Sequence, residues 1–450
     1  MRRDIYELDQ KSVRSMIAYI ACPAILSLLV QAVYSLVDGI FVSYISETAI
    51  SAVSLAFVIQ NLEVSLFTGI ATGINAIISR SLGSGDKQGA RNAVLSGLVI
   101  QALVSLIFLL FGIFLVRPFF SVSTSDRSVI DYGIRYLRPC MIASVITGMQ
   151  ITHERFLNSV GLTQYVFISQ FAGAFVNIVL DRILIFGLGG IPGFGIAGAA
   201  YATIIGKAVS LTIEVFFNYA VNKTLFCHSE RKLDNKQIKD ICIIGIPSSA
   251  LGIVTSVGNY CLNIIVGGFS ITALSAFGIY IKIQTFLTMP SRGIGMALVT
   301  IFSFYYGRKC MDKIRETVLN GFLMLIAWGG ICAAVLLLFT EQIISVFNTN
   351  DEMMEIAITA TRIIAITYLP SMGMHCFTSF FEATGKSYLS LAFIFSRQFF
   401  ARIPFAYILS RSGDVNMIWW SFPISELVSD VVICFVFRHA YKTAEHRIRA

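Results

Sequence analysis

Long apolar stretches alternate with short polar segments along the whole chain. Each stretch has more than the roughly 20 residues that a helix needs to cross a hydrocarbon core of about 30 Å. Strands of a membrane barrel would instead be about 10 residues long, with alternating polarity. The pattern predicts an all-α polytopic membrane protein with twelve transmembrane helices, near residues 14–42, 48–79, 92–116, 130–153, 163–187, 195–221, 238–267, 271–304, 316–340, 355–380, 387–410 and 415–437.

The two halves of the chain repeat each other at an offset of 224 positions. Six spans per half is an even number, so both halves enter the membrane from the same side. This predicts two six-helix bundles related by a pseudo-two-fold axis along the membrane normal, as parallel internal repeats. We expect a first lobe at 1–221, a cytoplasmic linker at 222–240 and a second lobe at 241–450. Matched pairs include Pro23 and Pro247, Gln60 and Gln284, Gly69 and Gly293, Gly83 and Gly307, and Arg91 and Arg315.

Composition and charge agree with a membrane protein and set its orientation. Hydrophobic residues make up 56% of the chain and charged residues 13%, about half the charge of a typical soluble protein, and the mean hydropathy is +0.75. Most of the 34 Lys and Arg lie in segments on the side of both termini. The opposite loops hold Arg117, Arg127, Arg135 and Arg411. Both termini are therefore expected in the cytoplasm.

Several functional classes receive no support from the sequence. The net charge of +8 is spread over many inner segments, so we expect no nucleic-acid partner. The nine cysteines form no CxxC pair and the five histidines do not cluster, so we expect no metal cofactor and no enzymatic activity. The polar N-terminal segment and the long first apolar stretch do not fit a cleavable signal peptide.

Four polar side chains within the first-half spans are candidates for a cation-coupling site. Asn177 and Asp181 are four residues apart, so they share one helix face. Asp38 and Asp181 each lie about six residues before the outer end of a span, roughly 9 Å deep. Two nearby carboxylates in a low dielectric need a shared proton or a cation, and Thr203 on the returning span adds a further oxygen ligand. Oxygen ligands suit a small hard cation, so we expect Na⁺ or H⁺ here. Alternatively, Asp181 pairs with Arg182 or another basic side chain.

Other intramembrane residues have open roles. The prolines Pro23 and Pro247 would kink the first helix of each half, either as bending points or as static features. The second half carries Lys282, Arg292, Arg397 and Arg402, which either face a cavity or pair structurally. Candidates for a substrate cavity are Gln31, Tyr34, Phe57 and Tyr280, although packing is the commoner role of an aromatic residue. Glu63 and Glu214 have no evident partner in the sequence.

The order and spacing of these residues resemble the multidrug and toxic compound extrusion (MATE) family. The resemblance rests on Pro23, on Gln31-x-x-Tyr34-x-x-x-Asp38, on Ser81-Leu82-Gly83-Ser84-Gly85-Asp86, on Asn177-x-x-x-Asp181 and on Gly198-Ala199-Ala200-x-Ala202-Thr203. It implies a two-lobed antiporter that expels organic, often cationic, compounds in exchange for Na⁺ or H⁺, with the ion held by Asp38, Asn177, Asp181 and Thr203. The stretch 248–263 lacks the glutamate of some branches, so the chain looks closer to bacterial branches that depend on first-lobe aspartates.

The remaining expectations also follow from the resemblance. We expect a monomer in the bacterial cytoplasmic membrane, surrounded by lipid, with a small organic substrate. The alternative function is a lipid-linked saccharide flippase of the same superfamily. In that case the basic residues of the second half would hold a pyrophosphate.

Overall fold

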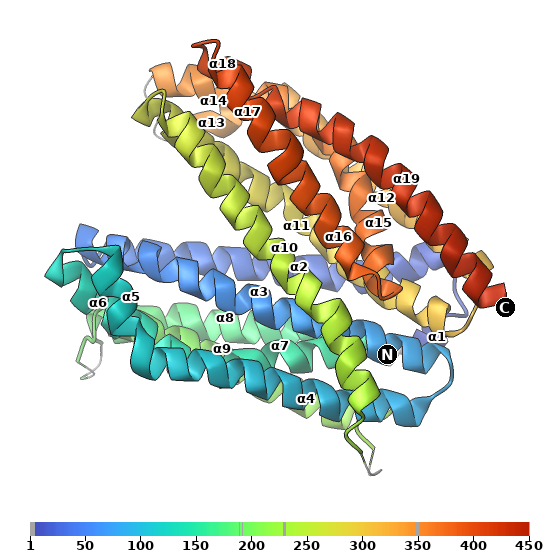
Figure 1. Cartoon of the computed structure of the whole chain (residues 1–450). Coiled ribbons are helices and arrows are strands. Elements are labelled where there is room, and N and C mark those ends of the chain that lie inside the picture. Colours follow the sequence, from blue (N-terminus) through green and yellow to red (C-terminus); the bar gives the residue numbers. More distant parts are fainter. Residues whose placement is uncertain (1–4, 189, 191, 228–230, 348–350, 450) are drawn as a thin grey trace.

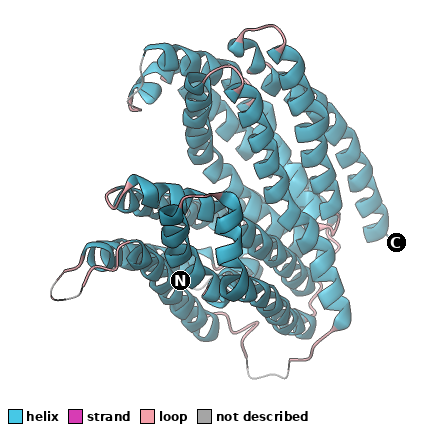
Figure 2. Cartoon of the chain, turned by 60° about the vertical axis from the view of Figure 1, so that its left-hand side comes forward, coloured by secondary structure: helices cyan, strands magenta, loops and turns pink. Residues whose placement is uncertain are grey.

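The computed structural model describes residues 5–188, 190, 192–227, 231–347 and 351–449, and every regular element in that part of the chain is a helix (Figure 2). Of the expected linker at 222–240, residues 228–230 lie outside the described part. The elements are α1 (Ile5–Leu8), α2 (Val13–Ser43), α3 (Glu47–Gly83), α4 (Lys87–Leu110), π-helix η1 (Phe111–Leu115), α5 (Val116–Ser123), α6 (Arg127–Ile142), α7 (Ser144–Ser159), α8 (Thr163–Phe186), α9 (Ile196–Ala220), α10 (Asn235–Gly267), α11 (Ile271–Gly307), α12 (Met311–Leu338), α13 (Thr340–Ser345), α14 (Asp351–Ala365), α15 (Tyr368–Ala383), α16 (Ser387–Phe395), π-helix η2 (Ser396–Arg402), α17 (Ile403–Ser410), α18 (Val415–Ile418) and α19 (Ser421–Arg449).

Local sequence signals explain where these helices start. The backbone N–H groups of Ala49 and Ala273 donate to the hydroxyls of Ser46 and Ser270, each at 3.0 Å. Serine caps of this kind satisfy N–H groups that have no partner inside the helix. The two serines are 224 positions apart, so the same capping signal starts α3 and α11 in both halves.

The helices coincide with the predicted apolar stretches. Nine helices of the described chain are long and apolar enough to cross a membrane, and the bent pair α14 and α15 makes a tenth span if counted as one. The remaining two stretches are interrupted, by the break between α6 and α7 and by η2. The all-helical membrane fold is therefore confirmed, and the number twelve stays a prediction. Both α2 and α10 continue through Pro23 and Pro247.

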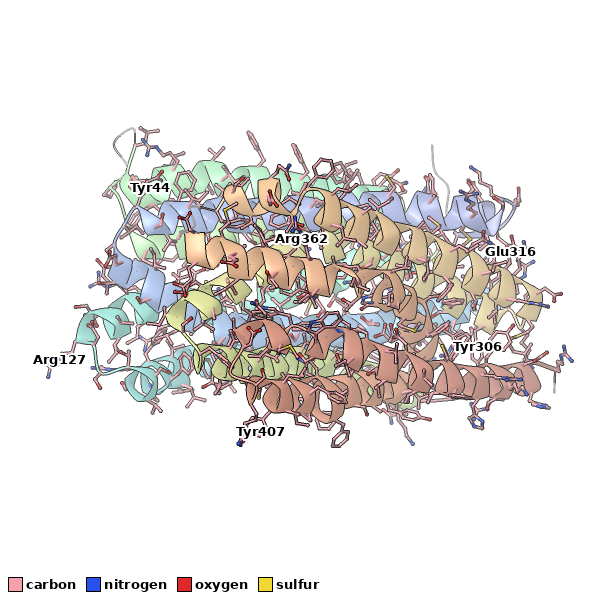
Figure 3. The ribbon with its side chains drawn as sticks, turned by 90° about the horizontal axis from the view of Figure 1, so that it is seen from above. Tyr44, Arg127, Tyr306, Glu316, Arg362 and Tyr407 are labelled. Carbon is pink, nitrogen blue, oxygen red and sulfur yellow. The ribbon has the colours of Figure 1, made fainter. Side chains whose placement is uncertain are left out.

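The helices form two bundles, α2–α9 and α10–α19, which we call the first and second bundle. Figure 1 shows them meeting near both termini and diverging towards the other side of the molecule. We call these sides the termini end and the far end. Figure 3 shows Tyr306 and Glu316 at the termini end, and Tyr44 and Arg127 at the far end. Between the bundles, α3 packs on α10, and α11 packs on α2 and α3.

The hydrophobic cores follow the same division. One core at the termini end draws buried residues from both bundles, including Ile17, Ile74 and Phe156 from the first, and Leu298 and Phe380 from the second. Two further cores each belong to one bundle alone. The bundles are thus joined by buried apolar surface at the termini end.

Glycines at the interface between the bundles show the repeat directly. A Cβ on Gly83 would lie 1.9 Å from the carbonyl oxygen of Phe304, and one on Gly307 would lie 2.0 Å from that of Arg80. The two contacts are each other's copy, because Arg80 and Phe304 are also 224 positions apart. A Cβ on Gly69 would lie 2.2 Å from the backbone nitrogen of Ser249, and one on Gly293 would lie 2.6 Å from Cγ1 of Ile25. These two contacts are related by the same offset. The bundles therefore meet in a pseudo-symmetric contact, as expected from the duplicated sequence.

The N-terminal residues contact both bundles at the termini end. The backbone N–H of Ile5 donates to the carbonyl of Val160 at 2.9 Å, and the hydroxyl of Tyr6 donates to that of Leu82 at 2.9 Å, both in the first bundle. Asp9 forms an ion pair with Arg308 at the end of α11. Residues 5–9 thus touch both bundles where they meet.

Candidate cation site and adjoining pocket

The candidate site begins with a close crossing of α8 and α9. A Cβ on Gly173 would lie 2.6 Å from the carbonyl oxygen of Gly206, and one on Gly206 would lie 2.9 Å from Cβ of Asn177. The two helices can approach this closely only because both positions are glycine. They run antiparallel, and Gly198 meets Leu184 further along. This register places Thr203 level with the turn from Asn177 to Asp181.

Asp38 reaches the same region from α2, which packs on both α8 and α9. It lies close enough to Asp181 for the two charges to interact. Asp181 is 0% exposed and Asn177 is 2% exposed, whereas Asp38 and Thr203 are half-buried. Three helices of the first bundle therefore bring all four predicted residues together.

The polar atoms of this group have no hydrogen-bond partners among the described residues. The unpaired buried atoms are Oδ1 of Asp38, both side-chain polar atoms of Asn177, both carboxylate oxygens of Asp181 and Oγ1 of Thr203. A buried polar group without a partner costs about 1–3 kcal/mol, and a buried charge costs more. The arrangement is costly as it stands, and a bound proton or cation would lower that cost.

The alternative pairing of Asp181 with Arg182 is wrong. The guanidinium of Arg182 lies over the ring of Phe186, with Cζ 5.3 Å from the ring centroid. Adjacent helix positions point about 100° apart, which explains the separation. Among the described residues, no group of three or more His, Cys, Asp or Glu side chains is arranged to hold a metal ion.

A small cavity of about 20 Å³, enough for one water molecule, lies beside the site, towards the termini end, and we call it the pocket. It is lined by one second-bundle residue, Met296 of α11, and otherwise by residues of α2, α7 and α8: Ala24, Ser27, Leu28, Gln31, Glu154, Asn158, Val166 and Gln170. Gln31 is thus a pocket residue, two helical turns from Asp38. The carboxylate of Glu154 accepts hydrogen bonds from Asn158 and Gln170, each at 3.3 Å, and lies 3.7 Å from the guanidinium of Arg155.

The other cavity candidates lie elsewhere. Tyr34 is half-buried on α2, Phe57 is exposed on α3, and neither lines the pocket. Tyr280 is 1% exposed and packs against Phe277 and Phe422 within the core of the second bundle. Its surroundings are those of a packing residue, and its part in a substrate cavity stays a prediction.

Two basic residues of the second bundle, Arg397 and Arg402, have a partner that the sequence did not reveal. Arg397 reaches Glu426 at 3.2 Å and Arg402 reaches the same carboxylate at 2.7 Å. Glu426 lies on α19 and is 3% exposed. Both arginines also lie over aromatic rings, Arg397 over Phe393 and Arg402 over Phe422. Arg397 and Arg402 are therefore paired structurally, whereas Lys282 is exposed on α11.

Two first-half acids also find neighbours. Glu214 accepts hydrogen bonds from Gln150 at 2.9 Å and from Ser169 at 2.8 Å. Glu63 lies within electrostatic range of Lys207, whose amino group donates to Thr147 at 3.2 Å. Neither acid joins the Asp38–Asp181 group.

Sequence reasoning missed the pocket residues Glu154 and Gln170, and also Tyr136, which is buried near Asp38. Arg155, beside Glu154, lies within α7 and is buried. The available signal was the helix spacing of Glu154 and Asn158, which are four residues apart and so share a face.

Comparison with known proteins identifies the class. The family model MatE matches residues 23–183 and again residues 247–408, two segments that begin 224 positions apart. The chain belongs to the MatE family, and it is a multi-pass membrane transporter, not an enzyme.

Full-length relatives carry related descriptions. The "Probable multidrug resistance protein YoeA" of Bacillus subtilis (strain 168) is 23% identical over 95% of this chain and 94% of the relative. The "Multidrug export protein MepA" of Staphylococcus haemolyticus (strain JCSC1435) is 20% identical over 96% and 95%. A solved structure described as the outward-facing conformation of a multidrug resistance MATE family transporter has a TM-score of 0.92 at 21% identity, covering 98% of both chains.

Proposed function

We propose that this chain is a cation-coupled antiporter that exports small organic compounds, many of them cations, by alternating access. The coupling ion, Na⁺ or H⁺, binds at Asp38, Asn177, Asp181 and Thr203. The observation that carries the proposal is the set of buried, unpaired polar atoms that these side chains present to one another. Relatives described as multidrug export proteins support the substrate class.

The distribution of positive charge orients the molecule in this proposal. With both termini in the cytoplasm of a bacterial cell, the far end faces outward. The bundles share a buried core at the termini end and diverge at the far end (Figure 1), so this arrangement is outward-facing. Asp38 lies nearer the far end than the pocket does, which lets a cation from outside reach the site. We expect the protein to work as a monomer.

Ion binding is coupled to export through α2. A cation or proton between Asp38 and Asp181 removes their mutual repulsion. The same helix carries Pro23 below the pocket and Ser27 and Gln31 in its wall. Loading the site therefore changes the position of α2 at its proline and weakens the hold on a substrate beside the pocket. Pro247 is the corresponding bending point of the second bundle.

The energy available is sufficient for export. One charge moving down about 100 mV releases about 2.3 kcal/mol. At about 1.4 kcal/mol per tenfold ratio, this supports a substrate gradient of roughly fifty-fold.

The flippase alternative has less support. It would use the basic residues of the second half to hold a pyrophosphate. Arg397 and Arg402 already share the carboxylate of Glu426, and Asp430 lies within electrostatic range of Arg397, so both guanidinium groups have acidic neighbours.

The decisive experiment measures ethidium efflux from proteoliposomes, with a Na⁺ gradient and a pH gradient imposed separately. Wild type should export under at least one gradient. Asp181→Asn should abolish export without loss of folded protein, because it removes the charge that holds the cation. Asp131→Asn is the matched control, since Asp131 is exposed on α6 and should tolerate the same change. Unimpaired export by Asp181→Asn would refute the site.

A further inference from the structure

Arg292 is a charged residue inside a membrane-spanning helix that the mechanism above does not use. It lies in the middle of α11, and its side chain is exposed. No hydrogen bond, ion pair or aromatic ring contact of Arg292 occurs within the described part of the chain. A charge at such a depth costs at least about 2.5–3.5 kcal/mol, and such residues usually pair or bind a ligand.

Its position is next to the pocket. Met296, which lines the pocket, is four residues further along α11, so Arg292 lies on the same helix face, one turn closer to the far end. The neighbouring Gly293 packs directly on Ile25 of α2, one residue from the pocket residue Ala24. Arg292 therefore lies between the two bundles, where α2 and α11 cross.

The nearby charged groups do not neutralise it. Arg292 lies within electrostatic range of Arg155 and of His375, neither of which carries negative charge. Glu154 is occupied by Asn158, Gln170 and Arg155. Glu382 accepts a hydrogen bond from Ser248 at 3.4 Å and lies near Arg155. Positive charge beside Arg292 further favours an anion at this point.

A guanidinium presents a planar array of N–H donors that matches a carboxylate or a phosphate. We propose that Arg292 binds an anionic group of the exported compound, while the aromatic or cationic part of that compound lies between the bundles, beside Gln31, Glu154 and Gln170. The preferred substrates are then zwitterions. This inference rests on the proposed export function and specifies its substrate class.

The placement also gives the anionic group a role in transport. The pocket walls belong mainly to the first bundle, and Arg292 belongs to the second. A zwitterion binds both bundles at once, whereas a simple cation contacts mainly the first. Loss of Arg292 should therefore affect compounds with an acidic group and spare those without one.

The test uses two dyes that differ in a single group: tetramethylrhodamine, which has a free carboxylate, and its methyl ester. Their binding to the purified full-length protein in detergent is measured by fluorescence anisotropy, with ethidium as a cation that lacks any acid. Wild type should bind the free acid about tenfold tighter than the ester, because the acid adds charge-assisted hydrogen bonds. Arg292→Gln should abolish this preference, and Arg292→Lys should keep part of it.

Control variants separate the anion site from general damage. Lys282→Gln removes an exposed positive charge from the same helix and should behave like wild type. Arg292→Gln should bind the ester and ethidium at least as well as wild type does, which shows that the pocket is intact. Its Tm should stay within a few degrees of wild type.

Four results would overturn the inference. Equal affinity of wild type for acid and ester would do so, as would a preference that survives Arg292→Gln. Displacement of the acid by micromolar phosphatidylglycerol would assign the site to a lipid headgroup and not to a solute. If folded wild type bound neither dye nor ethidium and exported none of them, the proposed export function would fail, and this inference with it.

Discussion

The two bundles treat corresponding helices in opposite ways. In the first, the segment 173–181 carries Asn177 and Asp181, whose polar atoms are buried without partners. At the repeat position in the second, the segment 397–405 carries Arg397 and Arg402, both bonded to Glu426. The first bundle leaves these buried polar atoms without hydrogen-bond partners, whereas the second bundle pairs its arginines with Glu426.

This difference separates a binding site from a structural network. A buried ion pair holds its helices together as long as every member is present, and it has little need of a ligand. An unsatisfied group of carboxylate, amide and hydroxyl oxygens costs stability until something binds. Duplication supplied two corresponding helices, and the first-bundle copy carries the unpaired polar atoms of Asn177 and Asp181.

The largest effect should come from breaking the paired cluster. Glu426→Ala leaves the buried Arg402 and the half-buried Arg397 without their anion and should destabilise the protein by about 3–5 kcal/mol. Thermal unfolding in detergent measures this as a large fall in Tm. Glu341→Ala, which breaks the exposed pair with Arg362, is the control and should have a much smaller effect. Equal effects of the two variants would show that the cluster has no special structural role.

The next largest effect should come from filling the unpaired site. If Na⁺ is the coupling ion, a concentration of about 100 times its Kd should stabilise wild type by about 2.7 kcal/mol. Potassium at the same ionic strength is the control. Thermal unfolding of wild type and Asp181→Asn should show the gain only in wild type. A gain of the same size in the variant would place the Na⁺ site elsewhere.

A smaller effect should follow from Asp181→Asn without any added ion. Since the carboxylate of Asp181 has no partner, its replacement by a neutral amide should leave the Tm unchanged or raise it, by an amount equivalent to about 1 kcal/mol. The same variant loses transport in the efflux assay. A marked fall in Tm would indicate that Asp181 belongs to a structural network, as Glu426 does.

The smallest effect should come from the surface pair at the termini end. Asp9 and Arg308 form an ion pair in which the arginine side chain is 51% exposed. Asp9→Asn should therefore cost less than about 1 kcal/mol, and less again at high salt. Thermal unfolding at two salt concentrations measures this. A cost comparable to that of Glu426→Ala would contradict the distinction between buried and exposed pairs.

Much of the fold could be predicted from the sequence because its signals are local or periodic. Long apolar stretches mark the helices, and serine caps mark where α3 and α11 begin. The offset of 224 gives the two bundles. The grouping of the candidate cation-site residues was also accessible, because Asn177 and Asp181 share a helix face and Asp38 lies at the same depth. Only the grouping of Thr203 needed the α8–α9 register, which depends on the glycine contact at Gly206.

The remaining features depend on which helices pack together. Glu426 meets Arg397 and Arg402 only because α19 packs on η2. The π-helical turn also matters, since its i→i+5 hydrogen bonds bring residues five apart towards the same side. Hydropathy predicts an ordinary α-helix there. The pocket was missed because Met296 and Glu154 come from different bundles and are far apart in the sequence.

The matched glycine contacts at the termini end also bear on how the two bundles join. Gly83 meets the carbonyl of Phe304 as Gly307 meets that of Arg80. A contact in which each partner offers the same surface is the kind that two identical chains form around a two-fold axis. The junction of the bundles therefore has the geometry of a homodimer interface, and the segment between α9 and α10 joins its two halves within one chain.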